Sequence, residues 1–282
     1  MKKTHVNSSK PSQQQLDSLI KLYQDRQYID AEKLSLSITE EFPKHPFAWK
    51  VLGAILNQKG KISESLIVFQ KSVQLDPQDA KAHNNLAIML ISQSRLEEAE
   101  TSLRQAIELK PDLAEAHNNL GVILEKQRKF DKACSAFIQA INFNPDFTDA
   151  YENLGMVIKK VRFNSSNVKL YPLLTRLLST GNFVRPMDLA PSILSLIKHD
   201  PLIKNLLLEE NFATSLKEAN SIIGSLDKLT LLHHLMRVCP LPDLQFEKFF
   251  VTMRSLLLTN LDNFEASPEF IYFLSTLSLH CF

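Results

Sequence analysis

Small, apolar and polar positions recur along the first half of the chain with a period of 34 residues. The phrase HNNL at residues 83–86 returns at residues 117–120, together with the apolar positions around it. Aligned on this step, four segments superpose and a partial fifth follows: residues 12–45, 46–79, 80–113, 114–147 and 148–161. Within each segment the apolar residues have helical spacing, at i, i+3 and i+4. The pattern predicts an array of helix pairs, one pair per segment.

Small residues and prolines hold fixed places in the repeat. A small eighth residue would let the first helix approach its neighbours closely. This place is occupied by Gly53, Ala87, Gly121 and Gly155. A proline stands near the end of each complete segment, at positions 43, 77, 111 and 145. Because proline cannot continue a helix, each is expected to end the second helix and set the turn into the next repeat.

These places match the tetratricopeptide repeat pattern of W-x2-L-G-x2-Y, then A-x3-F, then P. The fourth segment shows it in Leu120-Gly121, Leu124, Ala133, Phe137, Ala140 and Pro145. The array therefore resembles a tetratricopeptide repeat protein, and the resemblance implies an all-α, right-handed superhelix with a concave groove. The first segment is a degenerate copy with Leu19 at the small-residue place, as expected of a capping repeat.

Composition and charge exclude several classes of partner. The 282 residues are 44% hydrophobic and 22% charged, with a formal net charge of +1, as in an ordinary globular protein. So small a net charge gives no electrostatic case for a nucleic acid or an anionic membrane. Cys134, Cys239 and Cys281 are far apart and form neither a disulfide framework nor a metal-ligand cluster. We expect no metal and no cofactor.

No targeting or membrane-spanning segment is recognisable in the sequence. Residues 1–11 are predicted to form a disordered tail, since the basic start is followed by polar residues rather than an apolar signal segment. No apolar run approaches the ~20 residues that a transmembrane helix needs. With reduced thiols as the default, a cytoplasmic location is expected.

The repeat register is lost after Gly155, and residues 162–167 have the composition of a helix end and linker. A boundary near residue 162 is therefore predicted, with the array covering residues 12–161 and a second domain covering residues 162–282. This second domain is rich in leucine and phenylalanine and lacks the alternating segments that strands need. The composition predicts an irregular all-α domain.

Helix-starting residues divide the second domain. Pro172 is expected in the first turn of a helix or at a kink, and Asp188 is expected to cap the next helix. Asp243 is a candidate cap for a helix with an apolar stripe made of Phe246, Phe249, Phe250 and Met253. A further helix start is predicted at Ser267-Pro268.

The chain ends on Cys281-Phe282 without a polar last turn or a glycine, so we expect a fragment or a truncated reading frame. Residues 235–243 resemble the helical segment that joins the array of some bacterial repeat proteins to a catalytic domain, often a methyltransferase. On this alternative, the chain is the regulatory or substrate-docking part of a larger methyltransferase or glycosyltransferase. The apolar second half is also a candidate surface for homo-oligomer formation.

Enzyme signatures are missing from the sequence. It contains no GxGxxG, Walker-type loop, HExxH or paired CxxC. At least three of its six glycines are needed for helix packing, so too few remain for a phosphate-binding loop. His83 and His117 stand at the fourth repeat place, where other copies have an aromatic residue, so a packing role is expected. His233-His234 near Cys239 lacks a positioned third group, which favours a structural role. No enzymatic activity is expected of the chain itself.

One polar constellation is periodic. Asn85, Asn119 and Asn153 occupy the sixth place of the first helix in consecutive repeats and are expected along the concave wall. An asparagine amide offers one acceptor and two donors, so it can pair with both groups of a peptide unit. The row resembles the asparagine ladder of O-linked N-acetylglucosamine transferase, which grips extended substrates by their main chain. Alternatively, these asparagines bond only between neighbouring helices.

Other groove positions carry polar side chains of mixed sign. The candidate peptide-binding residues beside the asparagine row are Lys50, Lys81, Asn84, Asn118, Glu125, Lys126 and Lys160. A carboxylate clamp for chaperone C-termini is disfavoured, because Ala54, Glu115 and Asn119 replace three of the residues that it needs. The leading hypothesis is a non-catalytic scaffold that binds an extended peptide or a protein partner in the groove.

Overall fold

The computed structural model describes residues 10–180, 184–201, 203, 204, 229–239, 241, 243–259 and 275. The chain divides into two compact units, Met1–Phe147 and Thr148–Phe282. Every regular element in the described part is a helix, which confirms the all-α class expected from the sequence. Among the described residues, no helix combines the length and the apolar character needed to cross a membrane.

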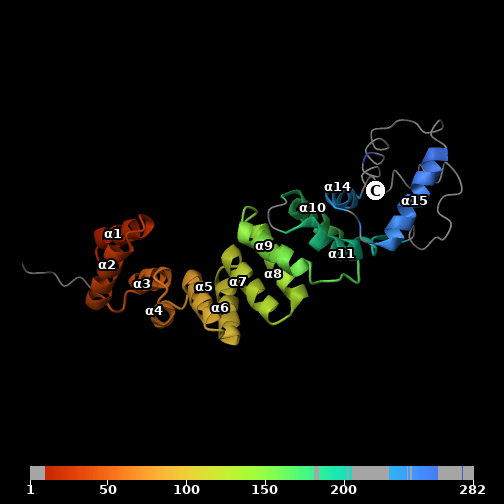
Figure 1. Ribbon diagram of the computed structural model, residues 1–282. Coiled ribbons are helices and arrows are strands. Elements are labelled where there is room, and N and C mark those ends of the chain that lie inside the picture. Colours follow the sequence, from red (N-terminus) through yellow and green to blue (C-terminus); the bar gives the residue numbers. More distant parts are fainter. Residues whose placement is uncertain are drawn as a thin grey trace, which may run out of the picture. The chain divides into compact units, whose positions relative to one another are not determined.

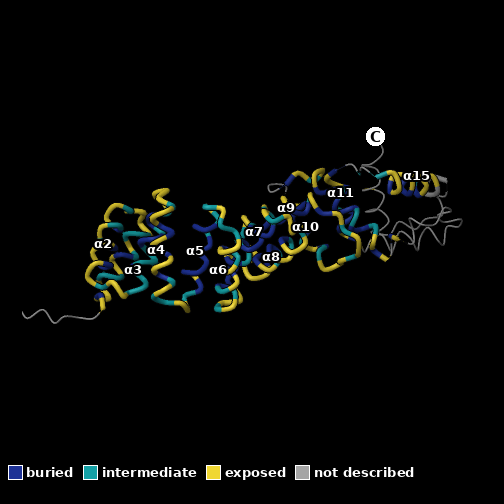
Figure 2. Tube along the Cα trace, turned by 90° about the horizontal axis from the view of Figure 1, so that it is seen from below, coloured by how far each residue is buried: buried dark blue, intermediate teal, exposed yellow. Residues whose placement is uncertain are grey.

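The first unit consists of four helical hairpins in succession (Figure 1). The first helix of each hairpin, called helix A, is α1 (Gln13–Gln24), α3 (Pro46–Gln58), α5 (Ala80–Ser92) or α7 (Ala114–Lys126). The second, called helix B, is α2 (Tyr28–Glu41), α4 (Ile62–Leu75), α6 (Leu96–Leu109) or α8 (Phe130–Phe143). Each helix packs against the next one in the chain, and the contacting faces are buried while the outward faces are exposed (Figure 2).

Helix B ends two residues before the proline in every complete repeat, at positions 41, 75, 109 and 143. The residue between helix and proline is the C-cap, and its N–H donates to the carbonyl four residues earlier. Its backbone leaves the helical region because the proline ring that follows would clash with a helical conformation there. The prediction that the prolines end helix B is confirmed.

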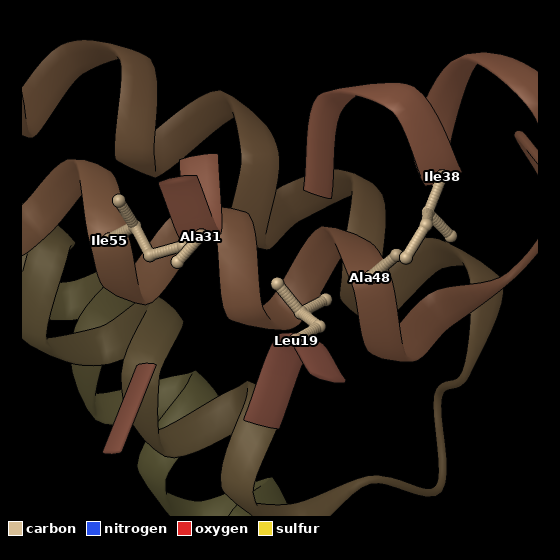
Figure 3. Packing of buried hydrophobic residues seen from close by; sticks show 5 residues of the cluster. All are labelled: Leu19, Ala31, Ile38, Ala48 and Ile55. Carbon is tan, nitrogen blue, oxygen red and sulfur yellow. The ribbon is translucent and has the colours of Figure 1, made fainter. Parts of the chain in front are cut away.

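The degenerate first repeat joins the array through a shared apolar core. Leu19 is fully buried with Ala31, Ile38, Ala48 and Ile55, and Figure 3 shows these side chains together. The residues come from α1, α2 and α3, so the large side chain at the small-residue place fills space between the first hairpin and the second. Full burial of a leucine contributes roughly 1.5–3 kcal/mol.

The fourth repeat place holds a ring that fastens each hairpin to the turn before it. The ring nitrogens of Trp49, His83 and His117 lie 2.9, 3.0 and 2.8 Å from the proline carbonyl six residues earlier. A carbonyl can only accept, so Nε2 of each imidazole carries the proton and donates it. The structural role expected for the two histidines is confirmed, and the hydrogen bond explains why histidine can replace tryptophan here.

The second unit is described in parts. Its described elements are α9 (Thr148–Ile158), the 3-10 turn η1 (Val168–Leu170), α10 (Tyr171–Thr180), α11 (Pro186–Ile197), α14 (Thr230–Val238) and α15 (Leu244–Thr259). Helix α11 packs against α9 and α14, and α10 packs against α14. A buried hydrogen bond of 2.7 Å from the Tyr171 hydroxyl to Asp200 ties α10 to the residues after α11.

Two helix starts predicted for the second unit are confirmed and one is wrong. Pro172 lies in the first turn of α10. Asp243 caps α15, since its Oδ1 accepts the N–H groups two and three residues later at 3.1 and 3.3 Å. Asp188 is not a cap, because α11 begins at Pro186 and places Asp188 in its first turn. Proline suits a first helical position, where its missing N–H costs nothing, and this signal outweighs the aspartate.

The apolar stripe predicted for the helix after Asp243 is buried, with exposures of 0 to 4% for Phe246, Phe249, Phe250 and Met253. The helix start predicted at Ser267-Pro268 and the chain end at Cys281-Phe282 lie outside the described residues.

Candidate functional site

Helices A form one side of the first unit. Successive helices A contact one another: α1 with α3, α3 with α5, and α5 with α7. Successive helices B approach one another less closely, so the array curves toward helices A. We call this inner side the A face. The sequence places the asparagine row and most candidate peptide-binding residues on helices A.

A hydrogen bond between two amides joins α5 to α7 on the A face. Nδ2 of Asn119 donates to Oδ1 of Asn84 at 2.9 Å. Asn84 is only 7% exposed, whereas Asn119 is half-buried. The bond uses one of the two amide hydrogens of Asn119, so its other hydrogen and its carbonyl oxygen remain for a further partner. Asn119 therefore bonds between neighbouring helices without exhausting its capacity.

The other asparagines differ in exposure. Asn85 is half-buried on α5, and its amide makes no hydrogen bond within the described part of the chain. Asn118 is 6% exposed and offers little surface. Asn153 is half-buried on α9, which belongs to the second unit. Binding of a peptide by these residues stays a prediction.

Lys50 is engaged within the fold. Its ammonium pairs with Oδ2 of Asp79, whose other oxygen caps α5 by accepting the N–H groups of Lys81 and Ala82 at 3.0 and 3.1 Å. Burial alone would raise the pKa of Asp79, but the hydrogen bond and charge of Lys50 and the two N–H groups outweigh it and lower that pKa. Lys50 thus holds α3 to the start of α5.

The remaining charged candidates give the A face a mixed sign. Lys81 on α5 and Lys126 on α7 are exposed, and Glu125 beside the latter is half-buried. Lys160 is exposed and follows α9 in the second unit. A face of mixed sign favours a partner with polar main-chain contacts over a strongly charged one.

His234 and Cys239 of the second unit each have a hydrogen-bond partner within the fold: Ser179 for His234, and the carbonyl of Leu235, at 3.6 Å, for the Cys239 thiol. Ser179 Oγ lies 3.1 Å from Nε2 of His234 and donates its one hydrogen to the carbonyl of Thr175 at 2.7 Å. The imidazole must then donate to the hydroxyl, the reverse of what a general base does. Cys239 is buried, and burial raises the pKa of its thiol to about 11, so little thiolate forms at neutral pH.

Family models identify the repeats of the first unit. A TPR repeat model matches residues 88–128, and two tetratricopeptide repeat models match residues 68–101 and 114–147. The chain contains tetratricopeptide repeats. These matches end at residue 147, so the proposed likeness of the second half to a segment preceding a transferase domain has no support.

Several solved structures are similar to part of this chain at low sequence identity. A crystal structure of MamA is 23% identical, with 51% of this chain and 79% of that chain covered and a TM-score of 0.46. MamA from Desulfovibrio magneticus RS-1 is 17% identical, with 52% and 82% covered and a TM-score of 0.47. YrrB, a TPR protein with an unusual peptide-binding site, is 18% identical, with 60% of this chain and 86% of that chain covered and a TM-score of 0.49. No curated protein matches the sequence.

Proposed function

We propose that the tetratricopeptide repeats form a non-catalytic scaffold that binds an extended peptide of a partner protein along the A face. The observation that carries the proposal is the bond from Asn119 to Asn84. It holds the Asn119 amide in one orientation and leaves one N–H and the carbonyl oxygen for a ligand. Groups that are ordered before binding lose less conformational entropy when the ligand arrives.

The repeat spacing suits an extended chain. Neighbouring packed helices lie roughly 8–10 Å apart. An extended peptide rises about 3.3–3.6 Å per residue, so it presents an equivalent peptide unit to successive helices A about every third residue. Asn85 and Asn119 occupy equivalent places on α5 and α7 and are therefore candidate successive contacts.

The expected affinity is modest. If Asn85 and Asn119 each made two hydrogen bonds, each bond would contribute about 0.5–1.5 kcal/mol. Ordering the peptide costs a few kcal/mol. The main-chain contacts on the A face alone therefore correspond at best to roughly millimolar dissociation constants. Side-chain contacts with the polar residues around the row would then set the preference for one partner over another.

Asn85→Ala gives the clearest test, because the Asn85 amide has no hydrogen bond within the described part of the chain and its loss should not disturb folding. A peptide array would select a binder, and isothermal titration calorimetry would measure its affinity. Loss of two hydrogen bonds should weaken binding by about 5-fold to 100-fold.

Asn142→Ala is the matched control, since Asn142 is exposed on helix B α8, outside the A face. It should leave the affinity unchanged. Asn119→Ala should also weaken binding, but it leaves the buried side-chain oxygen of Asn84 without its hydrogen-bond donor. The free energy of unfolding of this variant must therefore be measured as well. Equal affinity of the wild type and Asn85→Ala would remove the asparagine row from the proposal.

A further inference from the structure

A pocket of about 470 Å³ opens between helices B α6 and α8, away from the A face. We call it the B-face pocket. Its volume lies within the roughly 300–1,000 Å³ typical of ligand sites. It opens here because successive helices B approach one another less closely than successive helices A, which leaves α7 accessible between them.

The floor of the B-face pocket is apolar. Leu120 and Leu124 of α7 and Ala136 of α8 contribute to it. All three are less than 10% exposed, so the pocket reaches into the packed layer between α6, α7 and α8. An apolar side chain that displaced water from this floor would gain roughly 25 cal/mol per Å² of buried apolar surface.

The rim carries charges from both walls. Arg104 and Glu108 lie on α6, and Lys132 lies on α8. Arg104 is ion-paired with Glu100 at 2.6 Å, so its charge is already compensated, and Glu108 adds a second carboxylate one turn away on α6. Lys132 is exposed and takes part in no ion pair within the described residues. With Glu100 counted, the rim has two cations and two carboxylates, and Lys132 is the lining cation that has no ion pair among the described residues.

We propose that the B-face pocket binds an apolar side chain of a partner polypeptide that carries acidic groups beside it, one of which pairs with Lys132. A basic group at the same point would meet Lys132 directly, and near Glu108 it would meet Arg104. A purely apolar ligand would leave Lys132 unused. The B-face pocket is separate from the A face, so this proposal does not depend on whether the A face binds a peptide.

The probe is the fluorescein-labelled pentapeptide EEFEE, followed by fluorescence anisotropy at low ionic strength. Two control peptides separate the contributions. EEAEE lacks the apolar anchor, and KKFKK reverses the charges. Both should bind the wild-type chain at least 10-fold more weakly than EEFEE.

Three variants of the chain test the location of the site. Ala136→Leu fills the floor, and Lys132→Glu reverses the rim charge; each should weaken EEFEE binding at least 10-fold. Glu108→Gln removes the only carboxylate of the lining and should strengthen binding by about 2-fold to 5-fold. Lys21→Glu makes the same charge change as Lys132→Glu on the exposed surface of α1 and should have no effect.

Lys132→Glu alters an exposed side chain that has no ion pair in the described part of the chain, so the test remains valid if Ala136→Leu disturbs packing. Thermal unfolding followed by circular dichroism would detect such a disturbance. Equal affinity of EEFEE for wild type and Lys132→Glu would overturn the proposal. So would the absence of saturable EEFEE binding up to about 1 mM, an affinity that corresponds to only about 4 kcal/mol.

Discussion

The fifteenth place of each repeat lies in the left-handed region of backbone space. Arg26, Gly60, Ser94 and Arg128 stand there with φ of 58°, 73°, 59° and 60°. The place follows helix A and turns the chain into helix B. Only one of the four copies has glycine, so the other three carry the steric cost that a Cβ brings to this conformation, about 1–2 kcal/mol.

Exchanging residues at this place should change stability in opposite directions. Gly60→Ala should lower the free energy of unfolding by about 1 kcal/mol, because alanine is strained at a positive φ. An added Cβ would meet no atom within 4 Å, so a steric clash does not contribute. Ser94→Gly should raise it by up to about 1 kcal/mol, because the relief of strain exceeds the entropy cost of glycine. Equilibrium urea denaturation measures both changes.

A serine in a helix provides the control. Ser135→Gly in the middle of α8 should lower the free energy of unfolding by roughly 0.5–1 kcal/mol, the usual cost of glycine in a helix. If Ser94→Gly lowers stability by the same amount as Ser135→Gly, the left-handed strain has been overestimated.

Within each hairpin, the eighth residue of the repeat, on helix A, and the 24th residue of the repeat, on helix B, have complementary sizes. In chain order the pairs are Leu19 with Ser35, Gly53 with Phe69, Ala87 with Leu103, and Gly121 with Phe137. All of these residues are buried. A Cβ on Gly121 would lie 2.5 Å from a ring carbon of Phe137, so glycine is needed there to admit the ring.

A double-mutant cycle tests this complementarity. Gly121→Ala should destabilise the chain by about 1–3 kcal/mol through overpacking. Adding Phe137→Leu reproduces the natural combination of Ala87 with Leu103 and should recover part of that loss. Chemical denaturation of the four proteins should give a coupling energy of about 1 kcal/mol or more. Strict additivity of the two substitutions would show that the size pairing has no energetic meaning.

Helix positions could be predicted from the sequence where the repeat supplies several copies of one signal. The four prolines placed the ends of helix B correctly because each copy supported the others. In the second unit each helix start has a single weak signal. Aspartate is a common N-cap residue, which is why Asp188 is predicted to cap a helix, but Pro186 two residues earlier sets the start of α11. Nothing in the sequence alone ranks these two signals against each other.

The candidate site was only partly predictable. The 34-residue period placed Asn85 and Asn119 at equivalent points on helices A, and the structure agrees. The bond from Asn119 to Asn84 depends on how far successive helices A rotate past one another, which the period does not specify. The B-face pocket depends likewise on the separation of α6 and α8, and no sequence motif predicts it.

At the scale of the whole array, the two faces should respond differently to salt. On the A face the proposed contacts are amide groups, and the cation of Lys50 is already paired with Asp79. In the B-face pocket the ligand pairs with Lys132, which is exposed to solvent. Exposed charge pairs are screened as the Debye length falls from about 10 Å at 0.1 M salt to about 3 Å at 1 M.

Binding of EEFEE should therefore weaken several-fold between about 0.05 and 0.5 M sodium chloride, whereas binding of an uncharged A-face peptide should change less than about 2-fold. Anisotropy titrations of both ligands on the same wild-type protein provide the comparison. Lys132→Gln should weaken EEFEE binding and flatten its salt dependence together, because it removes the charge but keeps a polar side chain of similar reach. Parallel salt dependences for the two ligands would mean that both bind through the same kind of contact, and the assignment of separate chemistry to the two faces would fail.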